Sequence, residues 1–69
     1  MKSKTFNTIY GEVKFQFAML DTDGTTLEEG VEVKVNDELV AELVGARMSE
    51  FEELTDEEVE NLIVEKSWI

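Results

Sequence analysis

The fold is decided by an alternating stretch, EVKFQFAM at residues 12–19, in which apolar side chains occupy every second position. From Val13 to Met19 the apolar residues alternate with polar or small ones, which is the period of a strand with one buried face. The same period returns in VEVKVN at residues 31–36. Both stretches therefore predict β-strands.

The segment between these strands, DTDGT at residues 21–25, predicts a hairpin turn. Its Asp-Gly pair tolerates the positive φ that such turns require. A loop of only those two residues would set the apolar face of one strand against the polar face of the other, because a one-residue slip inverts the pattern. We therefore expect a longer loop, or a bulge at Gly30, that brings Val31 opposite Phe17.

A further strand is expected before this hairpin and a helix near the carboxyl end. Residues 4–10 are rich in Thr, Ile and aromatic residues and end at Gly11, which predicts a first strand folded back on the second. TDEE at residues 55–58 fits the capping box, in which Thr and Glu satisfy each other's backbone amides at a helix start. Leu54 and Val59 are placed as a hydrophobic staple around this cap.

Residues 37–51 allow two interpretations. Apolar residues at positions 39, 40, 43, 44 and 48 follow helical spacing with Asp37 as a candidate N-cap, and this pattern favours a helix. Asn36 and Asp37 would equally turn a hairpin into a fourth strand over residues 38–43. We expect the helix and keep the strand as the alternative.

The predicted fold class is α+β: an antiparallel β-meander of three strands, or four under the alternative, packed against one or two C-terminal helices. Residues 1–69 are expected to form a single small acidic domain, because typical domains run to about 100–150 residues. The expected core consists of Phe6, Val13, Phe15, Phe17, Met19, Val31, Val33, Leu43, Val59, Leu62 and Ile63.

The composition argues against several classes of function. His and Cys are absent, which removes the commonest general base, the thiolate nucleophile and the usual zinc and haem ligands. Seventeen acids against six bases give a net charge of −11, so the clustered cations that bind nucleic acid or an anionic membrane are missing. We therefore expect no direct nucleic-acid binding and no membrane association. No apolar run approaches the length of a transmembrane helix, so we expect a cytoplasmic location, which is the host cytoplasm if a phage encodes the chain.

No pattern of residues predicts catalysis, a cofactor or a metal site. Four carboxylates surround Gly24 as in a calcium loop, but EF-hand spacing puts Met19 and Gly30 where the first and last acidic ligands belong. The serines have no histidine to activate them, and no glycine opens a phosphate loop. A body this small offers little of the desolvating cleft that carboxylate catalysis needs. We expect the protein not to be an enzyme.

The strongest functional signal is the acidic run over residues 50–60, which holds seven acids and no base. Like charges within a Debye length of about 8 Å repel one another. A helix selected for solubility alone usually places Lys among its Glu residues, and the helix dipole explains only the acids of the first turn. The run therefore indicates a surface that meets cations on another molecule.

The sequence thus predicts a non-catalytic acidic protein that binds and blocks a basic site on a nucleic-acid-binding or nucleic-acid-modifying partner. Inhibitors of this DNA-mimic kind are encoded by phages and mobile elements against restriction or CRISPR proteins. The residues expected to contact the partner are Glu50, Glu52, Glu53, Asp56, Glu57, Glu58, Glu60 and Trp68.

Two other functions stay open at this point. One is a small structural or assembly module that forms a homodimer through an exposed strand edge or the Trp68 tail. The other is a carboxylate-based cation binder. Phe51 is expected in the core, whereas Trp68 falls off the apolar face of a continued helix and is open as a core or an interface residue.

Overall fold

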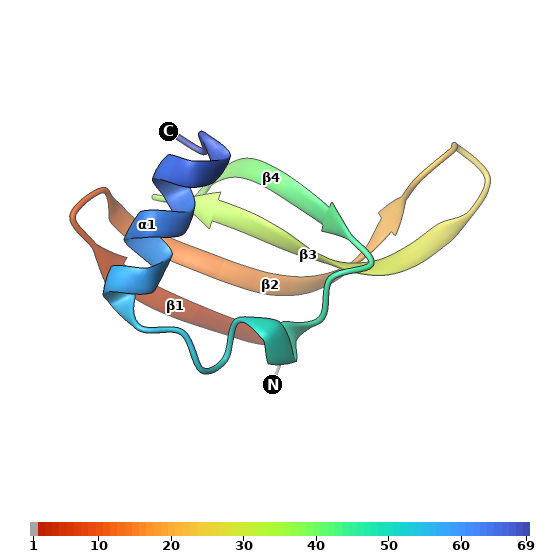
Figure 1. The fold of residues 1–69 in the computed structure, drawn as a ribbon. Helices are drawn as coiled ribbons and strands as arrows, with labels where there is room; N and C mark the ends of the chain where they lie inside the picture. The colour runs from red at the N-terminus through yellow and green to blue at the C-terminus, as the bar shows by residue number, and fades with distance from the viewer. Residues whose placement is uncertain (1) are drawn as a thin grey trace.

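The computed structural model describes residues 2–69, which form an open β-sheet with one α-helix beside it (Figure 1). The strands are β1 (Ser3–Thr8), β2 (Gly11–Asp21), β3 (Leu27–Val35) and β4 (Glu38–Val44). They pair antiparallel in the order β1-β2-β3-β4. A 3₁₀ turn, η1 (Met48–Glu50), and helix α1 (Asp56–Lys66) follow. The α+β class is confirmed.

The register of β2 on β3 is the one that the alternation predicts. Phe17 pairs with Val31 and Phe15 pairs with Val33. The connecting loop spans residues 22–26, so a longer loop sets this register and no bulge interrupts the β2–β3 ladder. Because side chains alternate between the two faces of a strand, this pairing places the apolar rows of both strands on one side of the sheet.

The helix expected over residues 37–51 is wrong, and the alternative of a fourth strand holds. Asn36 and Asp37 both have left-handed backbone conformations, with φ of 52° and 68°. Two such residues form the tight turn whose twist matches that of paired strands. The Asn36 amide supports the turn by accepting from the Glu12 N–H at 3.0 Å and donating to the Tyr10 carbonyl at 3.3 Å. The chain therefore returns along β3.

The helical spacing of apolar residues in β4 has a different origin. The ladder between β3 and β4 shifts register between Val33 and Lys34, as at a β-bulge. Val40 and Ala41 are both half-buried, whereas Leu39 is 47 % exposed. The apolar side chains at successive positions therefore lie on both faces of an outer strand that contains a bulge. They do not form one face of a helix.

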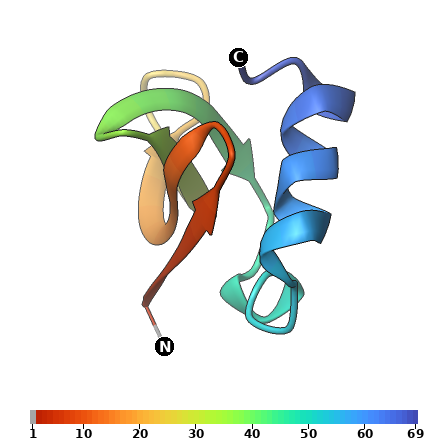
Figure 2. The same cartoon turned by 90° about the vertical axis from the view of Figure 1, so that its left-hand side faces the viewer.

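The core lies between the sheet and the helical layer, which Figure 2 shows as two separate layers with α1 beside one face of the sheet. Phe15 is at its centre. Its ring stacks on Phe51 with centroids 4.5 Å apart and forms an edge-to-face contact with Phe6, with centroids 5.6 Å apart. The buried residues of this core are Phe6, Val13, Phe15, Val31, Val33, Val35, Met48, Phe51, Val59 and Ile63.

Four residues expected in the core are less buried than predicted. Met19 is 51 % exposed, and Phe17, Leu43 and Leu62 are half-buried. Met19 pairs with Glu29, one position beyond the last β3–β4 pair, where the hairpin extends past the rest of the sheet (Figure 1).

Leu20 is buried instead, on the opposite face of the hairpin. It packs over Gly30, where an added Cβ would lie 2.5 Å from its Cδ1. The missing side chain of Gly30 creates the space that Leu20 fills, which strand alternation alone does not reveal.

Candidate functional site: the acidic segment

The acidic segment, residues 50–60, begins at the 3₁₀ turn η1. Met48 and Phe51 are buried and hold this turn against the core. The Glu50 carboxylate accepts a hydrogen bond from the Arg47 backbone N–H at 2.6 Å. Glu50 is exposed, but its carboxylate is already used to cap the start of the turn.

Helix α1 starts inside the acidic segment, at the position that the sequence predicts. The Thr55 hydroxyl accepts from the Glu58 N–H at 3.1 Å, and the Glu58 carboxylate accepts from the Thr55 N–H at 3.0 Å. Asp56 and Glu57 complete an acidic first turn, where the positive end of the helix dipole stabilises negative charge. The density of acids at this point has a local structural cause, and the capping box is confirmed.

Two further acids connect the segment to strand β1. Glu60 is half-buried, and its carboxylate accepts from the Ile9 N–H at 2.9 Å, just after β1. Glu52 is also half-buried, and its backbone carbonyl accepts from the Lys4 ammonium. These contacts join residues about fifty positions apart and fix the helical layer to one edge of the sheet.

Three carboxylates of the segment are left for solvent. Glu53, Asp56 and Glu57 are exposed, and their carboxylates form no hydrogen bond or ion pair with any of residues 2–69. We call these three residues the acidic tip. The other four predicted acids, Glu50, Glu52, Glu58 and Glu60, form contacts within the fold, and the sequence pattern predicts such a contact only for Glu58.

The structure places Trp68 away from the acidic tip. Ser67 ends α1 in a left-handed conformation, with φ of 57°, and the Trp68 N–H donates to the Ile63 carbonyl at 3.0 Å. This turn brings the half-buried indole into an edge-to-face contact with the Phe15 ring, at 6.1 Å between ring centroids. The eleven residues of α1 span about 16 Å, so Trp68 and the tip lie at opposite ends of the helix.

The basic residues lie mainly on the other layer. Lys14 and Lys34 are directly opposite each other in the β2–β3 ladder, on the face away from the buried valines. Residues 48–65 contain eight acids and no base, between Arg47 and Lys66. The helical layer is therefore the more uniformly negative side of the molecule.

Carboxylates also gather in the loop between β2 and β3. In the β2–β3 loop, Asp23 accepts from the N–H groups of Thr25 and Thr26 at 2.9 and 2.8 Å. These donors, with the Thr25 hydroxyl, lower the pKa of Asp23. Asp21 accepts from the Gly24 N–H at 2.7 Å. No cluster of three or more potential ligands exists within residues 2–69, so the calcium reading gains no geometric support.

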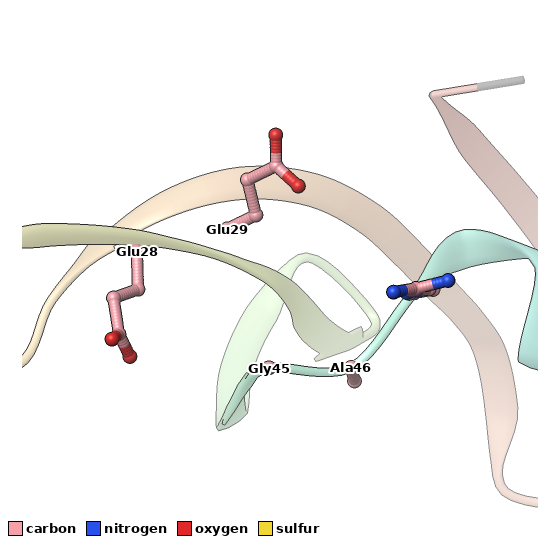
Figure 3. Close-up of a pocket in the computed structure, with 5 residues that line it drawn as sticks. Glu28, Glu29, Gly45 and Ala46 are labelled. Atoms are coloured by element: carbon pink, nitrogen blue, oxygen red, sulfur yellow. The ribbon is translucent and has the colours of Figure 1, made fainter.

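A shallow hollow with a volume of about 340 Å³ lies between β3 and the end of β4 (Figure 3). It is lined in part by Glu28, Glu29 and Arg47. Glu28 and Glu29 point to opposite sides of their strand, as neighbours in a strand do (Figure 3). Their carboxylates therefore do not form the close pair that acid–base catalysis needs.

Comparisons with known proteins add no assignment. No family model matches this chain, and neither a curated protein nor a solved structure matches it. Among residues 2–69, no helix is long and apolar enough to cross a bilayer.

Proposed function

We propose that this protein is a non-catalytic acidic binder, which uses the acidic tip to occupy a basic, nucleic-acid-binding site on a partner protein. The observation that carries the proposal is the exposure of Glu53, Asp56 and Glu57 at one helix start, without a neutralising contact within residues 2–69. Glu50 and Glu58 surround the tip and contribute to its field although their carboxylates cap backbone amides. The contact surface is therefore narrower than the full acidic run.

The physical argument concerns association. The three carboxylates of the acidic tip are concentrated at one helix start, because Asp56 and Glu57 are in the first turn of α1 and Glu53 is three positions before Asp56. A concentrated negative field speeds encounters with a basic surface and makes them dependent on salt. Tethering of the helical layer by Glu60 and Lys4 keeps the tip in one orientation, so little ordering is needed on binding. We propose that the protein acts in the cytoplasm, as inhibitors encoded by phages or mobile elements do.

The test compares two variants of equal charge. E53Q/D56N/E57Q removes the tip, and E12Q/E28Q/E29Q removes three exposed acids of the sheet, so both change the net charge from −11 to −8. Wild-type protein is immobilised on a resin and incubated with lysate of the native host. It should retain a nucleic-acid-binding protein at low salt and release that protein at high salt. The tip variant should lose this protein, and the sheet variant should keep it.

A second step tests blocking directly. The retained protein is purified, and its nucleic acid should be displaced by the wild type but not by the tip variant. Melting temperatures of both variants control for the loss of helix-dipole stabilisation, which is about 0.3–1 kcal/mol per acid. The proposal fails if no protein is retained, or if the tip and sheet variants behave alike.

The alternative, an assembly module that forms a homodimer, has one observation in its favour. Strand β4 is at the edge of an open sheet, where unpaired backbone groups are able to accept another strand. A mass that rises with protein concentration and is insensitive to salt would support it.

A further inference from the structure

Strand β4 leaves one side of the sheet without a partner strand. The opposite edge, β1, is tied to the helical layer through Lys4 and Ile9, and α1 lies against it. Within residues 2–69, backbone bonds outside the β3–β4 ladder reach β4 only near its end, where the Ala46 N–H donates to the Leu43 carbonyl at 3.2 Å. The β4 edge is therefore open along most of its seven residues.

The backbone groups that face outward follow from the register. The Gly45 N–H donates to the Glu29 carbonyl at 2.9 Å, and regular antiparallel pairing continues back to Ala41. Bonded and non-bonded pairs alternate along such a ladder, so Glu42, opposite Glu32, belongs to a non-bonded pair. The N–H and carbonyl of Glu42 point away from β3 and are free to bond an added strand.

Both faces of the β4 edge offer apolar contact. Leu39 and Val44 are 47 % and 48 % exposed, and a shallow hollow of about 300 Å³ follows residues 39–42. On the helix side, Ala41 and Leu43 are half-buried against the core. An added strand would extend this partly covered apolar row and bury Leu39 and Val44 further.

The charge of the edge selects the occupant. Strand β4 carries Glu38 and Glu42 and no base, Asp37 precedes it, and the whole chain has a net charge of −11. We propose that the β4 edge binds one extended segment of a partner protein, in which apolar residues alternate with Lys or Arg, by strand addition. This proposal rests on the proposed function in one respect, the basic character of the partner, and it uses a different surface.

A second copy of this chain fits the edge less well. Self-pairing would bring Glu38 and Glu42 close to the same two acids on a strand without a base, in two molecules of charge −11. Like charges on neighbouring strands destabilise a sheet. The bulge near Val40 also twists the edge, which natural proteins use to avoid pairing with themselves.

The probes for the test are two synthetic octapeptides with four lysines each. Lys-Val-Lys-Val-Lys-Val-Lys-Val is able to form a strand, and the same peptide with backbone N-methyl groups on its fourth and fifth residues has the same charge but lacks two adjacent backbone donors. The first should bind about tenfold more tightly, because one of two adjacent N–H groups faces β4 in either register, so the second peptide loses a backbone hydrogen bond and its methyl group hinders close approach. It should also slow hydrogen exchange at the amides of Glu42 and Val44. Equal binding of both peptides would overturn the proposal.

Two variants locate the site on the edge. Glu42→Pro removes an outward N–H and no β3–β4 bond, so it should keep the fold, as checked by circular dichroism, and lose the preference between the peptides. Glu42→Lys leaves the backbone intact and serves if the proline prevents folding. It should weaken the binding of the alternating peptide by charge repulsion, and unchanged binding to this variant overturns the proposal. A dimer that protects the Glu42 and Val44 amides without peptide overturns it as well.

The same assay separates this inference from the proposed function. If the tip variant E53Q/D56N/E57Q loses peptide binding while Glu42→Lys keeps it, the proposed function is supported and strand addition is refuted. If Glu42→Lys loses binding and the tip variant keeps it, the edge is the binding site and the tip is not.

Discussion

The contact of Gly30 with its neighbours makes Gly30→Ala a sharp test of the packing between β3 and β4. A Cβ at this position would lie 2.5 Å from Leu20 Cδ1, 2.6 Å from the Leu43 carbonyl oxygen and 3.2 Å from Val44 Cα. Carbon atoms in contact normally stay about 3.5–4.0 Å apart. The Leu20 side chain is able to move, but the Leu43 oxygen belongs to the backbone of β4.

Two effects of opposite sign decide the outcome. Replacement of glycine by alanine at an unstrained position stabilises a protein by about 0.4–1 kcal/mol, through the unfolded chain. Overpacking of a well-packed site costs about 1–3 kcal/mol. Because two backbone atoms of β4 stand in the way, the second effect should win, and Gly30→Ala should lower the free energy of unfolding by about 1–2 kcal/mol. For a domain of this size that corresponds to a melting temperature lower by about 5–15 °C.

The assay is thermal and urea unfolding of wild type, Gly30→Ala, Leu20→Ala and the double variant. If Leu20 were the only obstacle, the double variant would show no cost for the added methyl group beyond that of Leu20→Ala. The Leu43 oxygen remains in place, so most of the cost of Gly30→Ala should persist in the double variant. A melting temperature of Gly30→Ala equal to or above that of the wild type would refute the close approach of β4.

Three other changes test the core, the helix start and the loop. Thr55→Ala should lower the free energy of unfolding by about 1 kcal/mol, as urea midpoints will show, and no change would refute the cap. Phe15→Leu removes the ring that stacks on Phe51, so it should lower the free energy of unfolding by more than about 0.5 kcal/mol in the same urea assay. A smaller decrease would contradict the contact between the two rings. The pKa of Asp23 is lowered from its ordinary value of 3.8 by the Thr25 N–H and hydroxyl, so the stabilising effect of this carboxylate is present above that value and disappears as the pH falls through the lower folded pKa. A carboxyl titration by NMR should show this lowered midpoint, and an ordinary midpoint would contradict the loop geometry.

Local patterns were sufficient for the central hairpin and for the start of α1. The pairing of Phe17 with Val31 follows from side-chain alternation, because any odd shift would expose one apolar row. The cap at Thr55 involves residues three positions apart, so it is contained in the sequence itself. The sequence also predicts that Phe51 is buried, and its ring is buried and stacked on Phe15.

The strand β4 and the roles of the acids were decided only by tertiary structure. Residues 38–44 carry apolar side chains whose spacing suits a helix, but pairing with β3 and the left-handed turn at Asn36 make them a strand. Glu60 is committed to the Ile9 amide, and Glu53 is not committed to any group within residues 2–69. Short-range periodicity cannot distinguish these cases, because the partners lie far away in the chain and meet only when the layers pack.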